Sequence, residues 1–288
     1  MESAFWDRVV AEGHKVPADR PLGDLTAELT TMLGSADPYV RDEIAYPTLA
    51  TWVSEGVYDD LLEGLGDGMA AGLLVGIGES GTDSVFRRSF SALVLAECVG
   101  RGGEHHLVAE EALIRWGDRL AGWLVRERDL RGFVPGKGWA HAVAHGADAI
   151  GALAGVDALG RLELTVLLDV IADRLLTPTD ARFLHGEDDR LASAAMAVLR
   201  RDLVELEVLE PWVARLAQSA APALAAAPTG ADLGADLGDP FRTNGNVQAF
   251  LRALHLQLAL APRPPACRAD LLLTLIAQLR QANPSYLG

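Results

Sequence analysis

Apolar residues recur every three or four positions along most of this chain, and this spacing constrains the fold more than any other feature. The pattern is clearest at residues 25–34, 110–127, 161–176 and 246–260. Such spacing places the apolar side chains on one face of an α-helix. No segment shows the convincing period-two alternation that indicates a half-buried strand. The sequence therefore predicts an all-α protein.

The predicted helices are separated by clusters of glycine, proline and aspartate, which indicate loops. Similar helix beginnings follow these breaks near residues 35, 83, 136, 186 and, more weakly, 238. Their spacing of roughly 45 to 60 residues is near or above the upper end of the HEAT-repeat range. Stacked repeats bury their apolar faces against their neighbours. We therefore predict a single HEAT-like α-solenoid over residues 1–288, with a compact two-layer helical bundle as the competing architecture.

The chain is strongly acidic, with 40 Asp and Glu against 25 Lys and Arg and a net charge of −15. Such a field repels polyanions, and no run of basic residues offsets it, so we expect no nucleic-acid partner. Cys98 and Cys267 are too few for a disulfide framework or a paired metal motif. The first 15 residues do not resemble a signal peptide, and no apolar run is long enough to span a bilayer. We expect a cytoplasmic protein without a membrane partner.

The segment "GKGWAHAVAHGADAIGAL" places polar side chains in a helix otherwise suited to burial. With a helix that begins near Gly138, the residues His141, His145 and Asp148 lie at i, i+4 and i+7 on one face. Two imidazoles and a carboxylate at this spacing can bind a divalent metal ion or act as an acid–base pair. The alternative is a buried hydrogen-bond network that locks adjacent repeats, because buried polar groups must be paired.

Charged and aromatic residues precede this helix and begin the next predicted repeat. Arg131, Lys137 and Trp139 lie near the predicted helix N-terminus, where free N–H groups favour a carboxylate or a phosphate. A tight turn with solvated charges is the alternative. In a solenoid, Asp188 and Arg190 would lie beside the histidine-bearing helix and could complete a metal shell or bind a ligand. Capping of their own helix is the simpler role.

Five segments together resemble the uncharacterised bacterial family catalogued as domain of unknown function 2785. They are "DPYVRDEIAYPTLATWV", "DSVFRRSFSALVLA", "RDLRGFVPGKGWAHAVAHGAD", "GEDDRLA" and "NVQAFLRALHLQL". The resemblance extends over almost the whole chain and is most specific from Arg131 to Asp148. It implies a soluble helical-repeat protein and supplies no reaction.

Three functions are compatible with these features. The first is a binding protein with a polar concave pocket centred on His141, His145 and Asp148, which would take a small molecule or a peptide. The second is a metal-assisted hydrolase that uses the same residues. The third is a purely structural scaffold. Because no nucleophile-elbow serine or phosphate-binding lysine motif is present, the sequence favours the binding protein. It predicts neither the ligand nor the oligomeric state.

Overall fold

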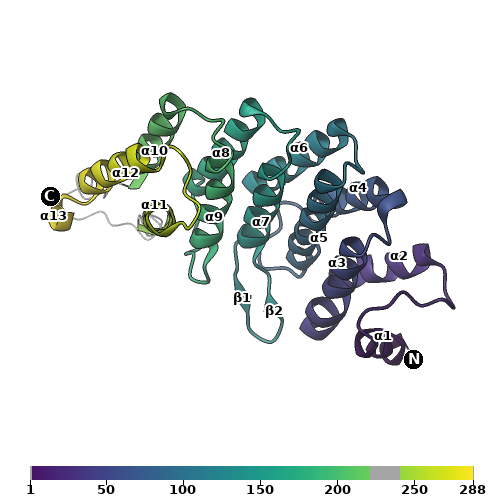
Figure 1. Cartoon of the computed structure of the whole chain (residues 1–288). Helices are drawn as coiled ribbons and strands as arrows, with labels where there is room; N and C mark the ends of the chain where they lie inside the picture. The colour runs from purple at the N-terminus through teal and green to yellow at the C-terminus, as the bar shows by residue number, and fades with distance from the viewer. Residues whose placement is uncertain (1, 221–240, 288) are drawn as a thin grey trace. The chain divides into compact units, whose positions relative to one another are not determined.

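The structure is a computed structural model that describes residues 2–220 and 241–287, without the side chains of residues 2, 3, 241–243 and 286. Most of the described residues are helical, and the two strands among them have only two residues each, which confirms the prediction of an all-α protein (Figure 1). The predicted break at residues 230–240 lies outside the described residues. The chain divides into two compact units, Met1–Ala158 and Leu159–Gly288, and each is described by itself. One continuous domain over residues 1–288 stays a prediction.

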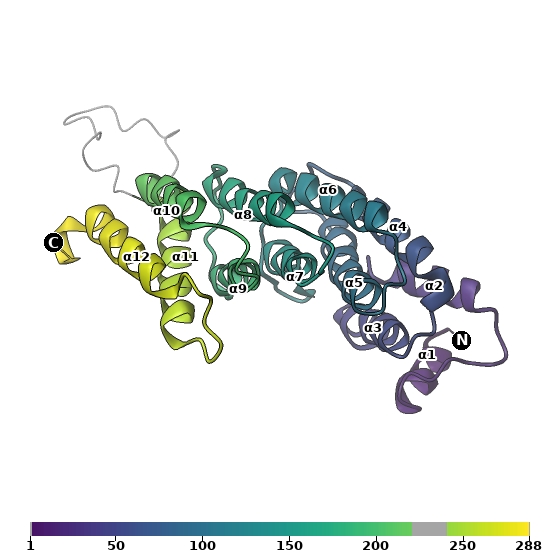
Figure 2. The same ribbon diagram turned by 45° about the horizontal axis from the view of Figure 1, so that its top comes forward.

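Unit 1 consists of paired helices in two layers. Figure 2 shows α3, α5 and α7 side by side in one layer, and α2, α4 and α6 in the other. The helices are α1 (Glu2–Ala11), α2 (Leu22–Met32), α3 (Tyr46–Ser54), α4 (Leu62–Gly72), α5 (Ser84–Glu104), α6 (Glu110–Arg126) and α7 (Ala142–Ala154). A π-helical segment, η1 (Tyr39–Ala45), leads into α3, and a short 3-10 helix, η2 (Asp59–Leu61), leads into α4.

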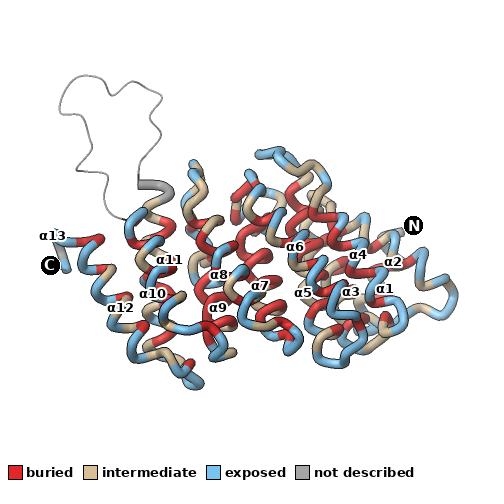
Figure 3. Tube along the Cα trace, turned by 90° about the horizontal axis from the view of Figure 1, so that it is seen from above, coloured by how far each residue is buried: buried red, intermediate tan, exposed pale blue. Residues whose placement is uncertain are grey.

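The most extensive helix contact in unit 1 joins α5 to α7. Small residues line α7, and Ala144 and Ala147 are almost completely buried. Short side chains of this kind let neighbouring helices approach closely, and the larger Phe86 and Leu95 of α5 are buried as well. Figure 3 shows the resulting buried faces along both layers of the unit. This close packing holds the beginning of α7 in a fixed position against α5.

The helix predicted to begin near Gly138 begins instead at Ala142, so that prediction is wrong. Residues Phe133–Val134 (β1) and Gly138–Trp139 (β2) form a short antiparallel hairpin ahead of it. The turn carries proline and then Gly136 at φ +76°, and the N–H of Lys137 donates to the carbonyl of Val134 at 2.9 Å. This is the pattern of a type II turn, which is incompatible with a continuing helix.

Unit 2 also pairs its helices, with α9 packed on α11 and with α10 packed on α8, α11 and α12. The helices are α8 (Arg161–Leu176), α9 (Glu187–Leu199), α10 (Leu206–Ala220), α11 (Phe241–Leu260), α12 (Arg268–Ala282) and α13 (Pro284–Leu287). The buried Asn246 side chain binds the loop before α9. It accepts a hydrogen bond from the N–H of Phe183 at 3.0 Å and donates to the carbonyl of Ala181 at 2.9 Å. None of the described helices has the length and apolarity needed to cross a membrane.

The close packing of α4 on α6 gives a stability prediction. A Cβ atom at Gly66 would overlap the indole of Trp116, whereas Gly68 in the same helix has open space around it. We expect Gly66→Ala to lower the free energy of unfolding by about 1–3 kcal/mol through overpacking. Gly68→Ala should raise it by about 0.5–1 kcal/mol, because alanine favours the helix. Urea denaturation of both variants measures these free energies. Equal changes in the two variants would contradict the close packing of Gly66 against Trp116.

Candidate functional site

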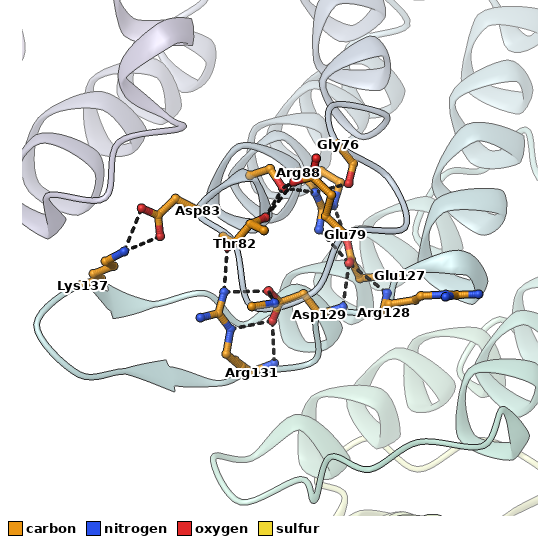
Figure 4. Close-up of polar contacts among 12 residues, drawn as sticks. Gly76, Glu79, Thr82, Asp83, Arg88, Glu127, Arg128, Asp129, Arg131 and Lys137 are labelled. Carbon is orange, nitrogen blue, oxygen red and sulfur yellow. Dashed lines mark hydrogen bonds and ion pairs between the residues drawn. The ribbon is translucent and has the colours of Figure 1, made fainter.

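The hairpin and the first turns of α7 bring together most of the residues that the sequence singled out. Those in unit 1 are Arg131, Lys137, Trp139, His141, His145 and Asp148. Asp188 and Arg190 lie in the first turn of α9 in unit 2. Contacts among the α4–α5 loop, the end of α6 and the hairpin hold the unit 1 residues in place, as Figure 4 shows.

A buried ion pair joins α5 to the end of α6. The side chains of Arg88 and Glu127 are both fully buried, and two hydrogen bonds of 2.6 and 2.9 Å connect them. Arg88 also donates to the carbonyls of Val75 and Gly76, while the indole N–H of Trp123 donates to Glu127 at 2.8 Å. These hydrogen bonds offset the unfavourable burial of both charged side chains.

The backbone after the ion pair is held by the same carboxylate and by a second one. The N–H groups of Arg128 and Asp129 donate to Glu127 at 3.0 and 2.9 Å. Asp129 is itself buried and accepts hydrogen bonds from Arg131 and from the N–H of Gly81. The hydrogen bonds from Arg131 to Asp129 raise the pKa of the guanidinium. Arg131, predicted as a ligand-binding residue, therefore has its charge neutralised within unit 1.

Two further cations fix the turn of the hairpin. Lys137 forms an ion pair with both oxygens of Asp83, at 2.6 and 2.8 Å (Figure 4). The fully buried Arg41 of η1 donates to the carbonyl of Lys137 at 2.8 Å and pairs with Asp42. Burial raises the pKa of Asp42, and Arg41 partly opposes that effect. The turn is therefore attached both to α5 and to η1.

The guanidinium of Arg41 is also packed between aromatic rings. Its central carbon lies 4.1 Å from the ring centroid of Phe86 and 4.9 Å from that of Phe90. These distances are short enough for favourable cation–π contacts. Arg41 thus connects the buried aromatic side chains of α5 to the backbone of the hairpin.

A row of ring contacts runs from the surface of the hairpin into the interior of unit 1. Phe133 and Trp139 are paired across the strands with centroids 5.0 Å apart and an angle of 72°. Trp139 stacks on His141 at 4.4 Å and 23°, and His141 meets His145 at 5.9 Å. His145 in turn packs edge-on against Phe90 at 5.1 Å. Phe133 and Trp139 remain 48% and 41% exposed, whereas His145 is only 6% exposed.

The three residues His141, His145 and Asp148 do not all lie within one helix, as the sequence had predicted they would. His141 is the N-cap of α7 and has a left-handed backbone, with φ +47°, so only His145 and Asp148 lie inside the helix. The rings of His141 and His145 are nearly perpendicular, at 82°. His145 is buried and Asp148 is half-buried. Metal binding by the trio stays a prediction.

The first turn of α9 contains Glu187, Asp188 and Asp189. The backbone N–H of His185 donates to the buried Glu187 carboxylate at 2.8 Å. That contact closes the turn into the helix. Asp188 is half-buried and Arg190 is exposed. Ligand binding by Asp188 and Arg190 stays a prediction.

Sequence reasoning did not identify Phe133, Arg41 or Glu127 as part of this region. Phe133 belongs to a strand of two residues, too short to show an alternating pattern. The buried charges of Arg41 and Glu127 resemble surface charges in the sequence, since Arg41 contacts Lys137 at 96 positions and Glu127 contacts Arg88 at 39 positions along the chain. The Pro-Gly pair at residues 135–136 could have predicted a hairpin, and with it the pairing of Phe133 and Trp139 on either side of the turn.

The buried ion pair gives a second stability prediction. Arg88→Met removes the guanidinium and leaves the Glu127 carboxylate buried, so we expect a loss of about 3–5 kcal/mol in unfolding free energy. Lys137→Met removes a half-exposed pair and should cost about 0–1 kcal/mol. Adding Glu127→Gln to Arg88→Met should restore part of the loss. Chemical denaturation measures all three, and similar losses for Arg88→Met and Lys137→Met would refute the ranking.

Comparison with known proteins gives one family. Residues 73–256 match the model of a family described as a protein of unknown function (DUF2785). The match covers more than half of the chain and includes the α4–α5 loop, the hairpin and α7. No curated protein and no solved structure matches the chain.

Proposed function

The chain belongs to the family of proteins of unknown function DUF2785, and we propose that it is a peptide-binding protein whose β1–β2 hairpin is the contact site. We also propose that its helix pairs are HEAT-like repeats of an α-solenoid. The repeated packing of neighbouring helices within each unit supports that part of the proposal. Repeat proteins of this kind commonly bind peptides or other proteins.

The observation that carries the proposal is the pair of exposed aromatic rings, Phe133 and Trp139. Single exposed apolar side chains are common on protein surfaces and need no explanation. Here two large rings are paired on one hairpin, and four neighbouring side chains hold that hairpin in place. The four are Arg41, Arg131, Asp83 and Asp129. A rigid aromatic pair loses little conformational entropy on binding, which is what an interface hot spot requires.

The polar residues predicted for the site have a supporting role in this proposal. Arg131 and Lys137 hold the hairpin through Asp129 and Asp83. His141 lies under Trp139 and limits the positions that the indole can take. The site is therefore an aromatic surface on a polar support, and it differs from the predicted polar pocket centred on the histidines.

Selection from a phage-displayed library of random 12-residue peptides tests the proposal. We expect enrichment on the wild-type protein, and a synthetic copy of an enriched peptide should bind Phe133→Ala or Trp139→Ala at least about tenfold more weakly. Leu61→Ala is the matched control, because Leu61 is 57% exposed in unit 1 away from the hairpin. Peptides whose binding survives both hairpin substitutions, or no enrichment at all, would reject the proposal.

A metal-assisted hydrolase is the second candidate, and one observation favours it. The ring centroids of His141 and His145 lie 5.9 Å apart, a separation at which two imidazoles can approach one ion. On this hypothesis the purified protein contains zinc, manganese or iron near one equivalent, and His145→Ala loses it. Elemental analysis of both proteins measures this. Wild-type protein that is folded and still metal-free after incubation with each ion would reject the hydrolase.

A further inference from the structure

We infer that the hairpin receives a cationic side chain, the lysine or arginine of a basic peptide, which packs on the exposed rings of Phe133 and Trp139. This inference rests on the proposed function and specifies its ligand. Three observations on unit 1 carry it: the distribution of charge, the pairing of the cations around the hairpin, and the geometry of the two rings.

The acid excess of the chain is concentrated in the unit that bears the hairpin. Residues 1–158 contain 25 acidic and 13 basic side chains, a net charge of −12, whereas residues 159–288 contain 15 and 12, a net charge of −3. A field of this sign raises the local concentration of cations and repels anions. A basic peptide therefore approaches unit 1 with electrostatic assistance.

Three of the cations that lie around the hairpin are each paired with an aspartate, so they offset little of this field. Lys137 contacts both oxygens of Asp83, and Arg131 contacts both oxygens of Asp129. Arg41 is fully buried and paired with Asp42. A carboxylate or phosphate ligand that binds one of these three cations would have to displace its aspartate. The anion site expected near Lys137 is therefore not favoured by the geometry.

The two rings supply a surface that suits a cation. The face of an aromatic ring carries negative electrostatic potential, and tryptophan attracts cations most strongly. His141 stacks on one side of Trp139, yet the residue stays 41% exposed, with Phe133 steeply inclined to it. A lysine or arginine can lay its alkyl chain on one ring and its charge on the other. Unit 1 contains the same type of contact internally, where Arg41 packs on Phe86.

Collisional quenching of tryptophan fluorescence tests the charge around Trp139 without any peptide. The other five tryptophans are at most 5% exposed, so quenching by dissolved ions reports mainly on Trp139. We expect caesium to quench more strongly than iodide, relative to N-acetyltryptophanamide at the same ionic strength, by a factor of about two or more. Trp139→Phe should remove most of the quenching. A preference for iodide would overturn the inference and leave the peptide-binding proposal intact.

The peptides selected on the wild-type protein test the ligand class directly. We expect hairpin-dependent peptides to contain lysine or arginine. Replacing the key lysine by norleucine should weaken binding about fivefold, and raising the salt concentration should reduce the difference between the two peptides. Leu61→Ala serves again as the control for the hairpin substitutions.

Each other outcome has a defined meaning. If neutral or acidic peptides bind in a way that depends on Phe133 and Trp139, the inference of a cationic ligand is wrong, while the proposal of peptide binding is supported. If tetramethylammonium chloride competes with the peptide at equal concentration, the site binds a small organic cation, and the inference of a basic peptide as ligand is wrong. The absence of hairpin-dependent peptides would overturn the proposed function together with the inference.

Discussion

The buried ion pair between Arg88 and Glu127 determines how the polypeptide leaves α6, and the candidate site depends on that path. Two charges without solvent exposure are unfavourable unless their hydrogen bonds replace the lost water. Here Arg88 of α5 supplies the guanidinium. The indole of Trp123 and the backbone N–H groups of Arg128 and Asp129 donate the other hydrogen bonds to the Glu127 carboxylate. The same carboxylate therefore neutralises a buried charge and orients the chain toward the hairpin. Alternative paths for this segment would leave Glu127 with fewer donors, so a single path is strongly preferred.

Arg41 makes the position of the hairpin depend on the amino-terminal part of unit 1. It lies 96 positions before Lys137 in the sequence, yet donates to the carbonyl of that residue. Its guanidinium is fully buried against two rings of α5, so it cannot move without disturbing the contact between α5 and α7. The hairpin is thus held by groups that are also part of the hydrophobic core. That shared support explains how two strands of only two residues each can have a defined position.

The sequence was sufficient for the helices and insufficient for the contacts between them. Periodicity predicted the amphipathic segments correctly, because burial of one helix face leaves a local pattern. It failed at Gly138, where a Pro-Gly turn and glycine backbones of positive φ favoured a hairpin and delayed the helix to Ala142. Trp139, His141 and His145 were identified from the unusual composition of their segment. The pairing of Arg88 with Glu127 was not, since 39 positions separate them and each alone resembles a solvated charge.

The burial of α7 explains why a contact surface would lie on the hairpin and not on the helix behind it. Nearly every residue from Ala142 to Ile150 is buried or half-buried, so the helix has little surface to offer a large partner. The proposed binding side chains therefore come from the segment before it. An antiparallel pair places directly opposite residues on the same face, which brings Phe133 and Trp139 together. The hairpin therefore exposes two rings at fixed separation while the histidines beneath remain part of the packed interior.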